Sequence, residues 1–257
     1  MNVPGISRPV LVVLIAFSIL LLAVGGSWAL SWATRETQTS TRTIAAAKTV
    51  EIDGHSGDIR VVGADRSDIL LTTRERRSVF GGPHGGVSFS DGRVHLDGSC
   101  PDFQLWGNDA GCSISYTLEV PRDTAVRLVT HSGDVSAEDL TGNADLETRS
   151  GDVDASGIGG ALRLQTRSGD VNADSTSTDI SASTRSGDVD LRARNATRVL
   201  AQTRSGDVHV SVPDRTYAVQ ATAASGDEDV DVSTDRRSPR TIVATTASGD
   251  VHVSRDG

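Results

Sequence analysis

The stretch Leu162-Arg-Leu-Gln-Thr-Arg-Ser-Gly-Asp-Val-Asn-Ala-Asp174 contains the pattern on which most of this sequence is built. Apolar and polar residues alternate up to Ser168, the triplet Ser-Gly-Asp follows, and alternation resumes at Val171. A period of two is typical of a β-strand with one buried face. The stretch therefore predicts two short strands joined at Ser-Gly-Asp.

The triplet recurs along the chain at nearly fixed spacing. Its copies begin at Ser56, Ser132, Ser150, Ser168, Ser186, Ser205, Ser225 and Ser248. Copies from Ser132 to Ser186 are 18 residues apart, and the later spacings are 19, 20 and 23. Such a period indicates stacked repeats that bury their faces only on their neighbours. We predict an all-β fold, a β-solenoid with repeats of about 18–20 residues; an antiparallel β-sandwich of the same strands is the alternative.

The parity of the apolar residues changes at each triplet. Residues six, four and two before the serine, and the serine itself, are expected to point inward, as are the residues three and five after it. A glycine at this point can adopt the positive φ of a corner or bulge. Five regular corners follow this pattern: Ser132, Gly133, Asp134; Ser150, Gly151, Asp152; Ser168, Gly169, Asp170; Ser186, Gly187, Asp188; Ser205, Gly206, Asp207.

Two outward columns of charge flank the corners. A basic column stands one residue before the serine, at His131, Arg149, Arg167, Arg185 and Arg204, and the triplet aspartates form an acidic one. The structural interpretation is that each aspartate accepts backbone N–H groups at its corner, while the arginines offset its charge.

A second acidic column, four residues after the serine, allows a calcium hypothesis. Calcium binds several oxygen ligands, and its weak candidates are Asp152, Asp154, Asp170, Asp188 and Asp190. The spacing matches no EF-hand loop or calcium nonapeptide. His209 and His252 share this column but are expected two coils apart, about 10 Å, too far for one zinc ion.

The amino-terminal segment is directed to a membrane. Residues 9–32 are almost wholly apolar, with no charge between Arg8 and Arg35, which is long enough for one transmembrane helix. We assign 1–33 to a cytoplasmic tip and anchor, 34–47 to a polar stalk, and 48–257 to the β-repeat domain. The alternative is a secreted protein produced by signal cleavage near Ala33.

The only two cysteines, Cys100 and Cys112, lie in one irregular segment. A disulfide between them would close a short loop and stabilise the fold by about 3 kcal/mol. Because disulfides persist outside the cytoplasm, we expect an extracytoplasmic repeat domain.

The repeats are interrupted by an irregular insertion at about residues 76–115. Two strand-like runs flank Asp91-Gly92, a hairpin signal, and aromatic side chains gather at Phe80, His84, Phe89, His95, Phe103 and Trp106. Such side chains either cap the solenoid or form a binding loop. A carbohydrate-active β-helix enzyme with its cleft at residues 80–112 is the competing hypothesis.

Composition and motifs argue against several other classes. The net charge of −9 disfavours nucleic acid and anionic lipid as partners. No nucleophile elbow, zinc-protease or phosphate-loop motif occurs. We therefore expect neither an enzyme nor a cofactor. The last motif, at Ser248, predicts a terminal coil whose edge strand is either blunted by His252, Arg255 and Asp256 or extended by a partner.

The recurring Ser-Gly-Asp-Val, its upstream Thr-Arg or Thr-His and the preceding anchor resemble the bacterial putative-adhesin β-strand-repeat family of unknown function. The segment Tyr116-Thr-Leu-Glu-Val-Pro121, leading into residues 126–135, is similar to the entry strand of that family. The resemblance covers about residues 48–257 and implies a surface-exposed, solenoid-like domain linked to adhesion or envelope sensing. Glu228 departs from the pattern, because it stands where valine is expected.

These observations together predict a membrane-anchored, extracytoplasmic β-repeat module for adhesion, envelope interaction or sensing. Its expected partners are an envelope polymer or a protein. The alternatives are the carbohydrate-active enzyme and a calcium-binding surface scaffold.

Overall fold

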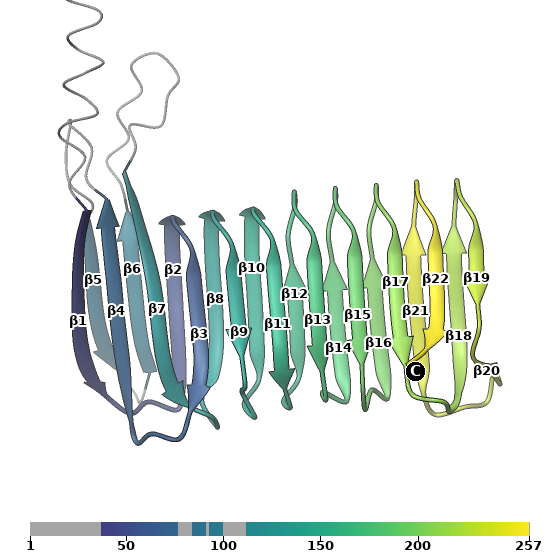
Figure 1. Ribbon diagram of the computed structural model, residues 1–257, viewed down its shortest axis with the longest axis horizontal. Helices are drawn as coiled ribbons and strands as arrows, with labels where there is room; N and C mark the ends of the chain where they lie inside the picture. Colours follow the sequence, from purple (N-terminus) through teal and green to yellow (C-terminus); the bar gives the residue numbers. More distant parts are fainter. Residues whose placement is uncertain (1–36, 77–83, 91–92, 100–111, 257) are drawn as a thin grey trace, which may run out of the picture.

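The computed structural model describes residues 37–76, 84–90, 93–99 and 112–256. Its strands form two 11-stranded sheets that run side by side along one long axis (Figure 1). The predicted anchor, residues 1–33, lies outside the described residues. Among the residues that are described, no helix is long and apolar enough to cross a membrane.

Both sheets are built from short strands. In spatial order, sheet 1 contains β1 (Thr37–Ala45), β4 (Asp68–Arg76), β7 (Ser113–Pro121), β3 (Ile59–Ala64), β9 (Val135–Glu138), β11 (Val153–Ile158), β13 (Val171–Ser175), β15 (Val189–Ala193), β17 (Val208–Val212), β22 (Val251–Arg255) and β19 (Glu228–Val230). Sheet 2 contains β20 (Ser233–Thr234), β18 (Thr216–Ala223), β21 (Thr241–Thr246), β16 (Arg198–Gln202), β14 (Asp179–Ser183), β12 (Leu162–Gln165), β10 (Ala144–Ser150), β8 (Ala125–Ser132), β2 (Thr49–Ser56), β6 (Arg93–Ser99) and β5 (His84–Ser90).

Each repeat contributes one strand to each sheet, and successive repeats pair in parallel. Leu146, Leu164 and Ala182 are register partners in sheet 2, and Val153 and Val171 are partners in sheet 1. Antiparallel pairs join β1, β4 and β7, and also β5 and β6, at the amino-terminal end. The predicted all-β repeat architecture is confirmed. The antiparallel sandwich is wrong for the repeats, because each strand pairs with its equivalent in the next coil.

The interior is a single apolar cluster of small and medium side chains. At six of the eight corners, the buried residues at equal sequence distance on the two sides are one larger residue and one alanine. The pairs are Leu128 with Ala137, Leu146 with Ala155, Leu164 with Ala173, Ala182 with Leu191, Ala201 with Val210, and Ala244 with Val253. All of these side chains are buried. The match keeps the enclosed volume nearly constant, as close packing requires.

The Ser-Gly-Asp corner depends on glycine. Gly169 has φ +141°, and a Cβ there would overlap the carbonyl group of Gly151 in the preceding coil. Thr166 donates its hydroxyl hydrogen to that same carbonyl oxygen at 3.0 Å. From Ser132 onward the corner serines are exposed rather than inward, which corrects the sequence expectation. The chain turns at Ser-Gly, so the alternation of the strand ends before Ser168.

The order of coils in space differs from their order in the sequence. Ser205 bridges to Ser248, and β22 lies between β17 and β19. The coil of Ser248 is therefore interior and the coil of Ser225 is terminal, so the prediction of an exposed edge at β22 was wrong. The reason is Glu228. The equivalent valines are buried, and a carboxylate in that position would be costly to bury.

In the terminal coil, Glu228 has another use. Its Oε1 accepts the backbone N–H of Ala223, an edge residue of β18, at 2.8 Å. The side chain that breaks the repeat thus satisfies a backbone group where no further coil follows.

The amino-terminal end is more regular than the sequence suggests. Residues 37–45, expected within the polar stalk, form β1 and pair with β4 along nine residues. Much of the expected insertion is also built into the sheets, because β6 pairs with β2 and β7 pairs with β3, both in parallel. The expected hairpin is present as β5–β6.

Candidate functional site

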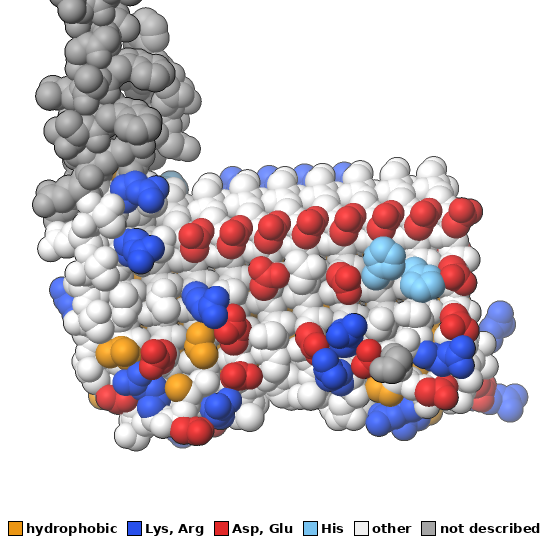
Figure 2. Space-filling view, in the orientation of Figure 1, with side chains coloured by type: hydrophobic (Ala, Val, Ile, Leu, Met, Phe, Trp, Pro, Cys, Tyr) orange, Lys and Arg blue, Asp and Glu red, His pale blue; other side chains and the backbone are white. Residues whose placement is uncertain are grey.

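The corner carboxylates form a straight line along the molecule, here called the aspartate row (Figure 2). In spatial order it consists of Asp58, Asp134, Asp152, Asp170, Asp188, Asp207, Asp250 and Asp227. Oδ1 of each aspartate accepts the backbone N–H of the next one, with N···O distances between 2.8 and 3.2 Å. The row is thus a structural ladder that joins neighbouring corners.

The basic column does not pair with this row. Arg149, Arg167, Arg185 and Arg204, here called the arginine row, are exposed. In the described part of the chain no ion pair joins them to an aspartate of the row. The expected neutralisation of one column by the other is therefore not observed.

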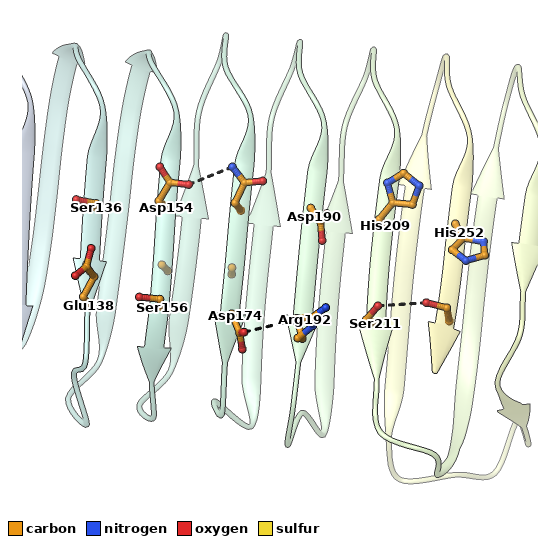
Figure 3. A pocket seen from close by; sticks show the side chains of 15 residues that line it. Ser136, Glu138, Asp154, Ser156, Asp174, Asp190, Arg192, His209, Ser211 and His252 are labelled. Atoms are coloured by element: carbon orange, nitrogen blue, oxygen red, sulfur yellow. Dashed lines mark hydrogen bonds and ion pairs between the residues drawn. The ribbon is translucent and has the colours of Figure 1, made fainter. Parts of the chain in front are cut away.

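The outer face of sheet 1 has a shallow groove of about 570 Å³, which runs across β9, β11, β13, β15, β17 and β22 (Figure 3). Residues four after each corner serine form its first row: Ser136, Asp154, Asn172, Asp190, His209 and His252. Residues six after it form the second: Glu138, Ser156, Asp174, Arg192, Ser211 and Ser254. Alanines 137, 155 and 173 contribute to the lining. The groove is open, polar and mixed in charge.

A pair of histidines lies at one end of the groove. His209 and His252 are register partners, and their ring centroids are 5.9 Å apart. The expected separation of two coils was wrong, because the coil of Ser248 is inserted next to that of Ser205. Asp229 Oδ2 lies 3.0 Å from His252 Nδ1, so a carboxylate orients this ring.

An arginine cluster holds the acidic centre of the second row. Arg194 Nε and Nη2 donate to the two oxygens of Asp174, at 2.5 and 2.6 Å. These hydrogen bonds, with the charges of Arg194 and Arg192, hold the pKa of Asp174 below its usual range. Asp174 is therefore ionised at neutral pH, and in the groove its negative charge lies next to the positive charge of Arg192.

The calcium candidates divide between two places. Asp152, Asp170 and Asp188 belong to the aspartate row, whereas Asp154 and Asp190 line the groove. Asp154 Oδ1 already accepts a hydrogen bond from Asn172 at 3.1 Å. Within the described ranges, no three side chains of His, Cys, Asp or Glu converge to hold a metal ion. The geometry therefore gives the calcium hypothesis no support.

The predicted enzyme cleft at residues 80–112 falls largely outside the described residues, as do Phe80, Phe103 and Trp106. His84 begins β5 and His95 lies in β6. Near them is a small hollow of about 60 Å³, lined by Gly85, Gly86 and Tyr116 among others. Burial, with the nearby charges of Asp97 and Glu75, raises the pKa of Tyr116 to about 12. A neutral phenol that donates to the backbone carbonyl of Asp97 at 3.1 Å fits a structural role.

Cys112 is disulfide-bonded. Cys100, the other cysteine in the sequence, lies outside the described residues, so the Cys100–Cys112 pairing stays a prediction.

Two features of these surfaces were not found from the sequence. The second row of the groove has the same parity as the first, two residues further on, and that spacing could have identified it. The proximity of His209 and His252 depends on coil order, and Glu228 was its sequence signal.

Comparison with known proteins places the architecture in a family. The model of the family described as Toastrack DUF4097 matches residues 122–256, more than half of the chain. No curated protein matches the sequence.

Solved structures resemble the fold at low identity. A "putative adhesin" from Bacteroides fragilis is 17% identical, with a TM-score of 0.55, over 86% of this chain and 97% of that one. A "putative cell adhesion protein" from Clostridium sporogenes is 11% identical, with a TM-score of 0.45, over 86% of this chain and 100% of the other. At these identities the likeness concerns the fold alone.

Proposed function

Because the chain belongs to the Toastrack DUF4097 family, we propose that it is a non-catalytic β-repeat module for adhesion, envelope interaction or sensing. The observation that carries this proposal is the open groove on sheet 1, which is lined by two rows of polar side chains across six strands. A rigid, repetitive and shallow surface suits a partner of extended shape, since many weak contacts can act together along it. The adhesin description of the Bacteroides protein supports the same role.

The proposal includes a place in the cell. The apolar run at residues 9–32 supports a single-pass anchor with the repeat domain outside the cytoplasm, and signal cleavage near Ala33 is the alternative. A disulfide at Cys112 supports an oxidising compartment. Thiol labelling of intact cells with a membrane-impermeant maleimide tests this. We expect labelling only after external reduction; strong labelling without reductant, or only after lysis, contradicts it.

Cell retention tests the groove itself. Cells displaying the full chain are passed over immobilised envelope material, and the bound fraction is measured against cells without the chain. Asp190 lies in the groove, is exposed and has no hydrogen bond or ion pair with any described residue. We expect Asp190→Lys to lower retention. Asp123→Lys is the matched control, because Asp123 is exposed in the turn after β7 and outside the groove.

Two outcomes count against the proposal. If cells displaying the wild-type chain are retained no more than cells without it, the module does not act in adhesion and the proposed function is wrong. If both lysine variants reduce retention equally, the effect is one of net charge and the groove is not the binding surface.

A further inference from the structure

The arginine row (Arg149, Arg167, Arg185 and Arg204) is a second surface with an arrangement of its own. Its members stand one residue before the corner serine in four successive coils. Backbone hydrogen bonds fix their alignment, since the carbonyl oxygens of Arg149, Arg167 and Arg185 accept from the serine of the next coil, each at 3.1 Å. The backbone positions of neighbouring arginines are therefore one strand separation apart, about 4.8 Å.

Histidines extend this line toward the amino-terminal end. His131 occupies the equivalent position in the preceding coil, and His55 occupies it in the coil before that. Their rings are stacked with centroids 5.1 Å apart. At the other end, Ala247 and Ala224 take the place of arginine, so the basic line has a defined length.

None of these four arginines is neutralised by a described residue. Their side chains make neither hydrogen bonds nor ion pairs within the described ranges, unlike Arg127, Arg194 and Arg255, which each pair with an aspartate. The aspartate row lies on the other side of the corner, and Oδ1 of every member except the terminal Asp227 accepts a backbone N–H. Like charges aligned at this spacing repel one another, and an anionic ligand would relieve that repulsion.

A groove accompanies the row on the side of sheet 2. It has a volume of about 360 Å³, and its lining includes His131, Arg149, Arg167, Arg185 and the polar pair Gln165 and Ser183. Gln165 Nε2 donates to Ser183 Oγ at 3.4 Å, and Gln165 Oε1 accepts from Arg163 at 3.1 Å, so this pair places polar groups beside the row. The one carboxylate of the lining is Glu147, which favours an anion bound toward Arg167 and Arg185.

We infer that the arginine row binds a linear acidic polysaccharide, with uronate carboxylates placed on successive guanidinium groups. Arginine presents a planar pair of donors that matches a carboxylate, and a polymer can repeat this contact from coil to coil. This inference deepens the proposed binding role and rests on it, because it names a partner class for the same module.

Other anionic partners fit less well. A flat anionic membrane pressed on this corner would also approach the aspartate row, which repels it. Binding of single-stranded nucleic acid relies on aromatic side chains that stack with bases, and the groove offers only His131. A flexible, narrow polymer can lie on the sheet 2 side and avoid the aspartates.

The experiment measures binding of polygalacturonate to the full chain in neutral detergent, with the fully methyl-esterified polymer as the uncharged probe. The row variant is Arg167→Gln/Arg185→Gln/Arg204→Gln. The control variant is Arg215→Gln/Arg236→Gln/Arg237→Gln, which removes the same charge from exposed arginines near β18 and β20. We expect salt-sensitive binding of the acidic polymer, at least about tenfold weaker in the row variant and changed less than about twofold in the control. Thermal unfolding of both variants checks that each is folded.

Three results would overturn the inference: equal loss in both triple variants, equal binding of the esterified polymer, or tighter binding to anionic vesicles or single-stranded DNA than to polygalacturonate. An Arg→Lys triple variant at the same positions gives an independent check, because it keeps the charge. Its affinity should fall between wild type and the glutamine variant, and affinity equal to wild type would refute recognition by the arginine fork. If cell retention persists while polygalacturonate fails to bind, the inference fails and the proposed function stands.

Discussion

The corner glycine should be among the least replaceable residues of the fold, and Gly169→Ala tests this. Its φ of +141° disfavours a side chain, with a strain of about 1–3 kcal/mol. The added Cβ would also lie 2.6 Å from the carbonyl carbon of Gly151 and 2.8 Å from Asp152 Oδ1. Relief of these contacts must separate the two coils.

Separation would weaken three hydrogen bonds between these coils. They run from Gly151 N–H to Ser168 O at 3.0 Å, from Asp170 N–H to Asp152 Oδ1 at 2.8 Å, and from Thr166 Oγ1 to Gly151 O at 3.0 Å. Each contributes about 1 kcal/mol. Together with the backbone strain, loss of all three bonds should lower the free energy of unfolding by about 4–6 kcal/mol.

The assay is urea unfolding of the full chain in neutral detergent, followed by circular dichroism. Gly159→Ala is the matched control, because φ there lies outside the range that disfavours side chains and the nearest atom to a new Cβ, Thr141 Cα, is 3.6 Å away. Its free energy of unfolding should stay unchanged or rise by up to about 1 kcal/mol. Equal losses in the two variants would refute the argument from corner geometry.

Three further predictions concern the corner threonine, the buried tyrosines and the order of the coils. Thr166→Val should lower the unfolding free energy by about 1 kcal/mol, because a buried hydroxyl loses its bond to the corner carbonyl, whereas Thr166→Ser should lose less in the same urea assay. In a spectrophotometric titration, Tyr116, with a pKa raised to about 12, and Tyr217, with a pKa raised by burial, should ionise above the ordinary value near 10. Their folded pKa values exceed the unfolded ones, so this stabilisation is complete below about pH 10 and decreases above it; native midpoints equal to those in urea would contradict the burial. Replacement of residues 213–240 by the four-residue loop 194–197 should leave a folded chain in which β21–β22 directly follow β16–β17. The reason is that Ser211 pairs with Arg192, and Thr241 pairs with Arg198, so the ends of β17 and β21 match those of β15 and β16. Unfolding of this variant under native conditions would contradict the coil order.

The regular part of the fold could be predicted because each repeat contains the local sequence signals that determine its structure. Alternation sets the buried face, glycine sets the corner, and the constant spacing sets the parallel stack. The exposed serine was missed because alternation was extended one residue into the turn. The strand at residues 37–45 was missed because it is mostly exposed and pairs only at an edge, so no apolar pattern marks it.

Coil order could not be derived from spacing, because it depends on a competition between two units for the interior position. The unit of Ser248 has Ile242, Ala244, Val251 and Val253 in the buried positions, whereas the unit of Ser225 has Glu228. An interior unit of Ser248 and a terminal unit of Ser225 give the lower free energy, because the Glu228 carboxylate is then not buried. The juxtaposition of His209 and His252 in the groove follows from that choice.

The two charged columns beside the corners show why repetition alone does not distinguish a scaffold from a binding surface. Both columns have the same period and both are expected to face outward, so the sequence alone does not distinguish them. In the structure the aspartates are joined to one another through backbone N–H groups, whereas the four arginines have no such partner in the described part of the chain. A charged column whose hydrogen bonds are made within the stack stabilises that stack. The arginines have no such partner among the described residues of any of their coils, so their hydrogen-bond donors face solvent. A repeating ligand on that column can gain binding free energy from each coil it crosses.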